Sequence, residues 1–320
     1  MRPFFSIPII AEIRKNMKII DAHSHLGDNQ YPYGGDIIEQ TGIKQKTIDS
    51  IMIAEALQFK FSWLNHLFYQ IFKPIVVRDT INRNKTASRE NMRKSMDEAG
   101  VSYTACLPIS LNFVSFDALV AAMKKDPGII PFTGVDHTKD YDYNQVYTSH
   151  VKSGAKGLKL HPIVQKLSLT DKKTYNIVEA FAPYELPVLF HCGITYYYVG
   201  KEKKNQTPEY GSIYYAERLV KSFPKVNFIA GHSGAYQVRD VINRLGKYKN
   251  VWVDTSFQSS SCIRKLIKTF GPEKVLYASD WPYGQRIPAI MAAKSACGGD
   301  THLEKAIFHD NAATLFKLTQ

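Results

Sequence analysis

The sequence predicts a single closed (β/α)8 barrel, and three observations indicate this fold class. Short apolar runs alternate with stretches of helical pattern from near residue 17 to the end of the chain. The runs are almost continuously hydrophobic, which is typical of parallel strands covered on both faces. Eight such runs fit into 320 residues, a length that α/β barrels commonly use for one domain. A closed barrel is therefore favoured over an open sheet.

Each element follows from its local pattern. The helical stretches have apolar residues at helical spacing, and several begin at Ser or Thr or end at Gly or Pro. The expected strands are 18–22, 103–108, 130–135, 157–160, 187–190, 227–230, 251–254 and 275–278. The expected helices are 91–99, 116–125, 170–181, 212–222, 238–247, 261–270 and 303–315.

The connection between the first two expected strands is irregular. Residues 26–90 are far longer than an ordinary loop between a strand and a helix. Within them, Ala54–Phe72 is rich in aromatic residues and is expected to be helical. Loops that follow barrel strands lie on the catalytic face, so this insertion (about 27–90) would form a lid, with an oligomer interface as the alternative. Residues 1–16 are expected to be an N-terminal extension, and 17–320 the barrel domain.

Composition excludes several classes of protein. The net charge is +12, but the basic residues are diffuse, and the densest cluster is Lys201–Lys204. We therefore expect no nucleic-acid partner. No apolar run approaches the roughly 20 residues that span a bilayer, and no signal peptide is evident. The four cysteines form no CxxC pair, which suits a reducing cytoplasm. The prediction is a cytoplasmic protein without a membrane partner, and a homo-oligomer is left open.

Two histidines, His23 and His25, end the first expected strand one residue apart. Strict strand alternation would place Asp21 on the same face as both of them. Because barrel active sites lie at the C-terminal ends of the strands, the polar residues there matter most. The later strand ends contribute Lys159, His161, His191, His232, Asp254 and Asp280.

Each of these residues has a structural alternative when it is considered alone. A single strand-end His is often a hydrogen-bonded structural residue, and Asp254 could bind a backbone amide. Their combination favours a metal site, since a catalytic divalent ion needs about three nitrogen or carboxylate ligands. The predicted ligands are His23, His25, His191 and Asp280.

Several short motifs occur in a fixed order along the chain. They are Asp-Ala-His-Ser-His (21–25), Gly-Leu-Lys-Leu-His-Pro (157–162), Val-Leu-Phe-His-Cys-Gly (188–193), Ala-Gly-His-Ser-Gly (230–234), Ala-Ser-Asp-Trp-Pro-Tyr-Gly (278–284) and His-Asp-Asn-Ala-Ala-Thr-Leu-Phe (309–316). With them, residues 17–317 resemble the amidohydrolase superfamily, in the amidohydrolase-2 branch. The resemblance implies a TIM barrel with a metal-dependent active site.

The resemblance also implies roles for individual residues. His23, His25, His191 and Asp280 match metal ligands, and Asp280 also matches the proton shuttle. His232 matches a histidine that polarises the substrate or acts as an acid or base. Lys159 lies where two-metal relatives carry a carboxylated lysine. Its Lys-Leu-His-Pro context is more similar to one-metal members, in which Lys159 and His161 would face the substrate. We expect one ion, zinc first, with manganese or iron as alternatives, and no second metal.

Three reactions remain open at this stage. The leading prediction is hydrolysis of a C–N or C–O bond in a small anionic substrate by a metal-activated water. The alternative is non-oxidative decarboxylation of a small carboxylic acid at the same site. A nuclease of the TatD type is less favoured, because Gly157–His161 lacks that group's metal-binding glutamate. Arg286 is a further candidate for anion binding, although a surface position is more expected, and Tyr196–Tyr198 is expected to wall the pocket or to pack.

Overall fold

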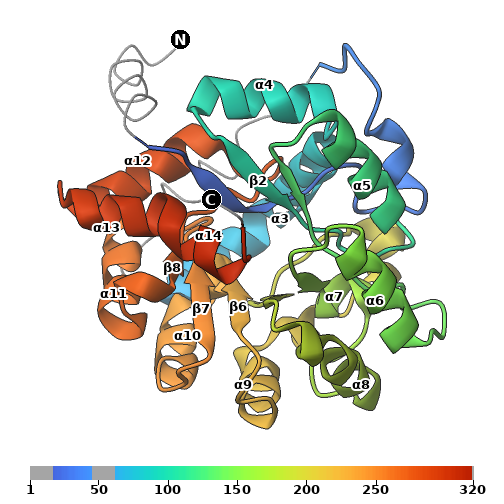
Figure 1. Ribbon diagram of the computed structural model, residues 1–320. Helices are drawn as coiled ribbons and strands as arrows, with labels where there is room; N and C mark the ends of the chain where they lie inside the picture. The colour runs from blue at the N-terminus through green and yellow to red at the C-terminus, as the bar shows by residue number, and fades with distance from the viewer. Residues whose placement is uncertain (1–16, 45–61, 319–320) are drawn as a thin grey trace.

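The computed structural model describes residues 17–44 and 62–318 of the chain. Each of the eight expected runs overlaps a strand, and all the strand pairs are parallel. Helices surround the strands (Figure 1). The strands are β1 (Ile20–Ser24), β2 (Tyr103–Cys106), β3 (Ile129–Pro131), β4 (Leu158–Leu160), β5 (Val188–His191), β6 (Phe228–Gly231), β7 (Val251–Asp254) and β8 (Val275–Leu276).

The strands form two sheets, β1-β2-β3 and β4-β5-β6-β7-β8, which meet at two seams. At the first seam, Thr133 bridges to Leu158 and links β3 with β4. At the second, Ser24 bridges to Trp281, and the Ala22 N–H donates to the Tyr277 carbonyl at 2.9 Å. Both seams close the ring, so the predicted (β/α)8 barrel is confirmed.

The helices begin and end largely where capping residues stand, as at Ser88 and Ser115, whose side chains accept from backbone N–H groups. The helices are α3 (Ser62–Asn84), α4 (Arg89–Ala99), α5 (Phe116–Lys125), α6 (Tyr143–Lys152), α7 (Pro162–Gln165), α8 (Lys172–Phe181), α9 (Ile213–Ser222), α10 (Val238–Leu245), α11 (Ser260–Phe270), α12 (Arg286–Cys297), α13 (Thr301–Lys305) and α14 (Asn311–Leu315). Shorter turns are η1 (Gly34–Ile37), η2 (Ala182–Tyr184), η3 (Gly200–Asn205), η4 (Pro208–Gly211), η5 (His232–Gln237), η6 (Pro272–Lys274) and η7 (Ala306–Asp310).

Several helical features differ from the expectation, and the short helix α7 is one that was not predicted. Helix α6 was not predicted, because its aromatic and polar residues give weak helical spacing. Helix α12 was not predicted either. Its Pro288 stands in the first turn, where a missing N–H costs little. The expected helix over 303–315 is interrupted by a π-helical turn, η7, between α13 and α14.

The insertion is described only in part. Helix α3 occupies its second half, while residues 54–61 of the expected helical stretch and the whole of 1–16 lie outside the described residues. Among the described helices, none has both the length and the apolar character needed to cross a membrane. All four cysteines lie in described segments, and each is a free thiol.

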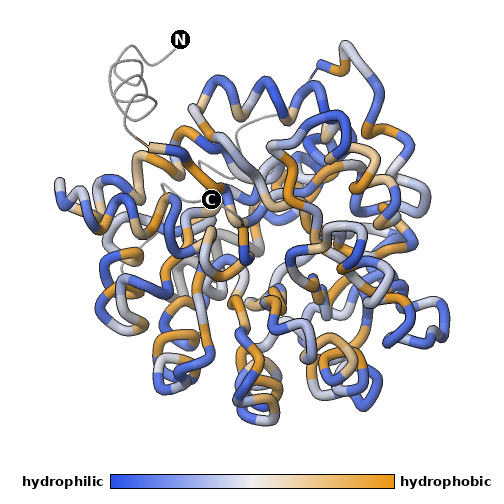
Figure 2. The backbone as a smooth tube through the Cα atoms, in the orientation of Figure 1, coloured by the Kyte–Doolittle hydropathy of each residue, from blue (hydrophilic) through white to orange (hydrophobic). Residues whose placement is uncertain are grey.

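The core has an inner and an outer part. Side chains from the strands fill the barrel, among them Ile20, Ala105 and Leu189, and Phe316, just past the end of α14, packs against them. A larger outer cluster lies between the strands and the helices. Figure 2 shows hydrophilic residues mainly at the periphery, with hydrophobic segments recurring on the strands and on the inner sides of the helices. The barrel is thus a packed scaffold, and its strand ends are the places where polar side chains gather.

Candidate active site

A β-bulge in β1 sets the direction of the two paired histidines. Asp21 pairs with Thr104 and Ser24 pairs with Cys106, so three steps along β1 match two along β2. The Ala22 side chain packs in the cluster inside the barrel. His23 follows it directly, yet His23 and His25 also point inward, to the mouth of the barrel. Asp21 turns outward to Arg286 of α12. The expectation that Asp21 shares a face with the histidines is therefore wrong, because the bulge breaks the alternation.

The Nδ1 atom of each histidine is held by an acceptor. His23 Nδ1 lies 2.8 Å from Asp254 Oδ2, and His25 Nδ1 lies 2.6 Å from the Leu107 carbonyl oxygen. Since carbonyl and carboxylate oxygens only accept, each ring carries its proton on Nδ1 and presents a lone pair at Nε2. Both Nε2 atoms approach Asp280 Oδ1, at 3.4 Å from His23 and 3.1 Å from His25.

Three acceptor atoms therefore converge in a buried place. Among the described residues, Asp280 Oδ1 has no hydrogen-bond partner. Burial lowers the pKa of His23 and of His25 well below its ordinary value, which keeps both rings neutral. Burial raises the pKa of Asp280 well above its usual range, although Lys159 opposes this shift. Lone pairs that face one another at this distance repel unless a proton or a cation lies among them, and two imidazoles with a carboxylate are ligands that divalent ions accept.

Lys159 of β4 lies directly beside this cluster. Its side chain is fully buried, and its Nζ is 3.0 Å from His23 Nε2. Burial lowers the pKa of Lys159 to about 8, with Asp280 and Asp254 acting in the opposite direction. The lysine thus offers a proton to one of the three lone pairs.

Asp254 at the end of β7 is saturated with hydrogen bonds. Its Oδ1 accepts from the backbone N–H groups of His232 and Ser256, each at 3.0 Å, and from Ser256 Oγ. Its Oδ2 faces His23 Nδ1. His23, His232 and Asp254 are close enough to form a second group of ligands, but these bonds account for them without an ion. The alternative that Asp254 binds a backbone amide is confirmed, and the carboxylate also orients His23.

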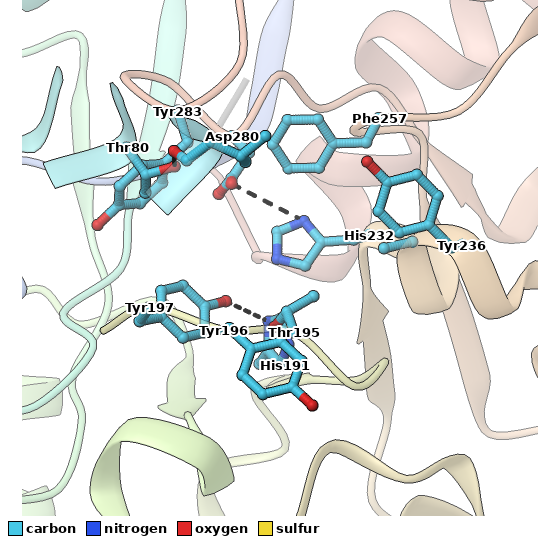
Figure 3. Close-up of a pocket in the computed structure, with 12 residues that line it drawn as sticks. Thr80, His191, Thr195, Tyr196, Tyr197, His232, Tyr236, Phe257, Asp280 and Tyr283 are labelled. Atoms are coloured by element: carbon cyan, nitrogen blue, oxygen red, sulfur yellow. Dashed lines mark hydrogen bonds and ion pairs between the residues drawn. The ribbon is translucent and has the colours of Figure 1, made fainter. Parts of the chain in front are cut away.

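His232 follows β6 and stacks on His23, with ring centroids 4.6 Å apart. Its Nδ1 lies 2.8 Å from Ser256 Oγ and 4.0 Å from Asp280 Oδ2 (Figure 3). The structure therefore brings His232 to the carboxylate with which it is expected to act.

His191 at the end of β5 lies next to the cluster rather than in it. Its Nε2 is 3.1 Å from the Gly193 carbonyl and 3.0 Å from Thr195 Oγ1, and its Nδ1 faces the Tyr197 hydroxyl at 3.3 Å. The ring is 5.0 Å from that of His232. His191 would have to turn away from these partners to become a ligand, so that role stays a prediction.

His161 stacks on His191 with centroids 4.5 Å apart, and its Nδ1 accepts from the Val164 N–H at the start of α7. Neither His161 nor Lys159 is among the described residues that line the cavity above the site. Their roles in binding substrate therefore remain predictions.

The cavity above the site has a polar floor and aromatic walls (Figure 3). His191, His232 and Asp280 belong to the floor. The walls include Thr195, Tyr196, Tyr197, Ala235, Tyr236, Phe257 and Tyr283. Tyr196 and Tyr197 thus line the pocket as expected, whereas Tyr198 is buried and donates its hydroxyl to the Gln30 carbonyl at 2.5 Å. The buried Tyr283 hydroxyl has no hydrogen-bond partner within the described part of the chain, so it offers a hydrogen bond to a molecule in the cavity.

Helix α3 contributes Val76 and Thr80 to the same cavity. This is the position that a lid requires. On the same helix, Ile71 and Ile75 are exposed, as the alternative of an oligomer interface requires. Both interpretations of the insertion stay predictions.

Arg286 is far from the surface position expected for it. Its side chain is only 2% exposed, and its Nε lies 3.1 Å from Asp21 Oδ2, on the outer side of the strands. That expectation is wrong because α12, which the sequence did not reveal, carries Arg286 into the space behind β1.

Several residues at the site have an unusual backbone. Positive φ angles occur at His232 (56°), Ala235 (50°), Phe257 (59°) and Asp280 (59°), all just past the ends of β6, β7 and β8. Side chains disfavour this left-handed region, and such strain tends to gather at functional sites. Gly193 has φ 102°, and a Cβ there would meet the Gly234 carbonyl oxygen at 2.5 Å, which explains the glycine after His-Cys.

Comparisons with known proteins agree with this geometry. The family model described as Amidohydrolase matches residues 73–318, well over half of the chain. The match begins after His23 and His25, so the family model does not cover these two residues. Their position in the site is known from the structure alone. No curated protein sequence matches the chain.

Solved structures share the fold at low sequence identity. One is 5-carboxyvanillate decarboxylase from Novosphingobium aromaticivorans with manganese and 4-hydroxy-3-methoxy-5-nitrobenzoic acid (15% identity, 96% of this chain and 97% of that chain, TM-score 0.65). A second is a probable 2-pyrone-4,6-dicarboxylic acid hydrolase from Acinetobacter baumannii with citric acid (15%, 94% and 100%, 0.57). A third is the IDCase of Metarhizium anisopliae in apo form (15%, 96% and 99%, 0.60). With its barrel, its buried His/Asp cluster and the extent of the family match, the chain belongs to the amidohydrolase family.

Proposed function

We propose that this protein is a metal-dependent hydrolase that cleaves a C–N or C–O bond in a small molecule. One observation carries the proposal. His23 Nε2, His25 Nε2 and Asp280 Oδ1 face one another in a buried place, and no group in residues 17–44 or 62–318 is hydrogen-bonded to the Asp280 oxygen. These three atoms fit a divalent ion, and a catalytic site of this kind leaves a position open for water.

The ligand set favours one ion. His23, His25 and Asp280 would hold it, with His191 as the additional ligand if its ring turns. Zinc is the expected metal, and manganese or iron accept the same nitrogen and oxygen ligands. A second ion is not expected, because the hydrogen bonds of Asp254 already account for the second group of ligand atoms.

A bound divalent ion supplies Lewis-acid polarisation and makes water easier to deprotonate near neutral pH. The chain supplies the rest. Asp280 accepts the proton of the attacking water and passes it to the leaving group. Its Oδ2 lies 4.0 Å from His232 Nδ1, so both groups reach the same reacting centre. His232 stabilises the negative charge that develops on the substrate oxygen.

The cavity narrows the class of substrate. Tyrosine and phenylalanine side chains form its walls, and among the described lining residues none is Lys or Arg. A small molecule with a flat apolar part fits such walls. The expected anionic group would then lie deep in the site near Lys159, whose buried Nζ is 3.0 Å from His23 Nε2.

Decarboxylation is the second candidate, and the aromatic walls favour it. A planar aromatic acid would pack between the tyrosines while Asp280 delivers a proton to the carbon that loses carbon dioxide. Two kinds of structural relative, a decarboxylase and a probable hydrolase, share this barrel. A nuclease is disfavoured, because the described walls offer no Lys or Arg for phosphate.

A panel assay on metal-loaded protein tests the proposal. Lactones, amides and aromatic acids would be incubated with the protein after loading with Zn²⁺ or Mn²⁺, and products and carbon dioxide would be measured together. Ring opening or amide cleavage without carbon dioxide supports the hydrolase, and stoichiometric carbon dioxide supports the decarboxylase. Turnover of none of the three classes by fully loaded protein would contradict both.

A further inference from the structure

A buried polar cluster lies behind the active site, on the outer side of the strands. We name it the seam cluster, because it lies where β8 meets β1. All its side chains are buried, and they come from β1, β2, the segment after β8, and α12. Its members are Asp21, Ser24, Thr104, Ser279 and Arg286.

Asp21 ties the two segments that carry the candidate ligands. Its carboxylate accepts from the Ser279 N–H at 2.9 Å and from Ser279 Oγ at 2.5 Å. It also accepts from Ser24 Oγ at 3.1 Å and from the His23 N–H at 3.3 Å. Ser279 directly precedes Asp280, and Ser24 lies between His23 and His25. The carboxylate thus fixes the backbone on both sides of the cluster of acceptors.

Arg286 in turn holds Asp21 and its neighbours. Its Nε is 3.1 Å from Asp21 Oδ2, and its Nη2 donates to Ser24 Oγ and Thr104 Oγ1, both at 3.2 Å. Its Nη1 donates to Ser95 Oγ of α4 at 2.9 Å. The planar guanidinium fork reaches all four partners at once, which the single ammonium of a lysine cannot do.

The backbone at this seam is irregular and needs such support. Strand β8 ends at Leu276, four residues before Asp280, and β1 carries its bulge at the same level. Past that point the backbone links are irregularly spaced: the Ala22 N–H donates to the Tyr277 carbonyl at 2.9 Å, the Asp280 N–H to the His23 carbonyl at 2.8 Å, and the His25 N–H to the Trp281 carbonyl at 2.7 Å. A regular ladder does not fix the separation of the histidines from Asp280, so side chains must contribute.

A buried ion pair is a poor source of net stability, because the cost of removing both charges from water offsets their attraction. We propose that Asp21 and Arg286 are positioning residues, which set the distance between the His23 and His25 imidazoles and the Asp280 carboxylate so that the three bind one cation. This inference rests on the proposed function for the existence of the metal site, and it assigns a new role to residues that do not touch the metal.

Cobalt binding tests the inference apart from catalysis. The dissociation constant for Co²⁺ would be measured by competition with a chelator, together with the visible absorption spectrum of the Co²⁺ protein. We expect Arg286→Lys, which keeps the charge but loses the fork, to fold and to bind Co²⁺ about 10–100-fold more weakly, with an altered spectrum.

The matched control is Arg93→Lys. Arg93 pairs with Asp126 through its Nε at 2.8 Å, in the loop that precedes β3 and away from the strand ends. The Arg93→Lys substitution should lower the midpoint of thermal unfolding. The Co²⁺ dissociation constant of this variant should stay within about twofold of the wild-type value. If Arg286→Lys does not fold, Ser279→Ala replaces it. That variant should weaken Co²⁺ binding several-fold and alter the spectrum.

Two outcomes would overturn the inference alone, given a wild type that binds Co²⁺. In the first, the seam variants bind Co²⁺ with the wild-type affinity and spectrum. In the second, Arg93→Lys weakens binding as much as they do, which would indicate a general loss of stability. A wild type that binds no Co²⁺ would overturn the proposed function, and this inference with it.

Discussion

The two seams of the barrel are held together in different ways. At the β3/β4 seam, backbone hydrogen bonds join the two strands. The Thr133 N–H donates to the Gly157 carbonyl at 2.9 Å, and the Lys159 N–H donates to the Thr133 carbonyl at 2.8 Å. At the β8/β1 seam, a buried Asp21–Arg286 pair accompanies the backbone bonds. Lys159 projects from a regular strand, whereas Asp280 follows a strand of two residues. The difference indicates that charged side chains help to hold the seam together where the chain leaves the strand conformation and positions the Asp280 carboxylate.

The substitution expected to change activity most lies at the end of the β8/β1 seam. Asp280→Asn should keep the fold and most of the metal, because the amide oxygen can still bind an ion, but turnover should fall about 10²–10⁴-fold through loss of the proton acceptor. Turnover of the substrate found in the panel, with thermal unfolding and metal content alongside, checks this. Near-normal turnover would remove Asp280 from the mechanism.

A smaller effect, on metal affinity, is expected from a substitution in β7, which lies at neither seam. Asp254→Asn weakens the contact to His23 Nδ1, so metal affinity should fall about 10–100-fold. The matched control is Asp136→Asn, another buried carboxylate past a strand end, which accepts from the Thr138 N–H at 2.9 Å. Chelator competition compares the two. Equal affinities would mean that Asp254 does not orient the histidine.

The smallest effect on the site is expected at the β3/β4 seam. Thr133→Val removes the contact between Thr133 Oγ1 and His150 Nδ1, which are 2.6 Å apart, and should lower the free energy of unfolding by about 1 kcal/mol. Metal affinity should not change, since backbone bonds hold Lys159 in place. Denaturant unfolding and chelator competition measure the two quantities. A large loss of metal affinity in Thr133→Val would show that both seams control the metal site. It would contradict the claim that the two seams differ in this respect.

Much of the fold could be predicted because its signals are local. The eight strands are short apolar runs, and parallel geometry brings their C-terminal ends to one rim, so strand-end position alone was enough to group His23, His25, His232 and Asp280. Helices α6 and α12 could not be found, because tertiary packing rather than spacing stabilises them. Residues 1–16 and 54–61 lie outside the described part of the chain, so expectations there are unchanged.

The details of the site depended on contacts between distant segments. The bulge in β1 exists only in the pairing of Asp21 and Ser24 with β2, and no local pattern announces it. The burial of Arg286 follows from α12 docking behind β1. The rotation of His191 toward Gly193 and Thr195 depends on the loop after β5. Residue type and spacing could predict which side chains gather, but not which way each one turns.

Metal content tests the central claim most directly. Elemental analysis of gently purified protein, followed by titration of the stripped protein with Zn²⁺ or Co²⁺, measures how many ions the site holds. The account predicts about one equivalent, lost on combined replacement of His23 and His25 by alanine in protein that remains folded. Finding no bound ion in the purified protein, and no saturable binding on titration, would contradict it.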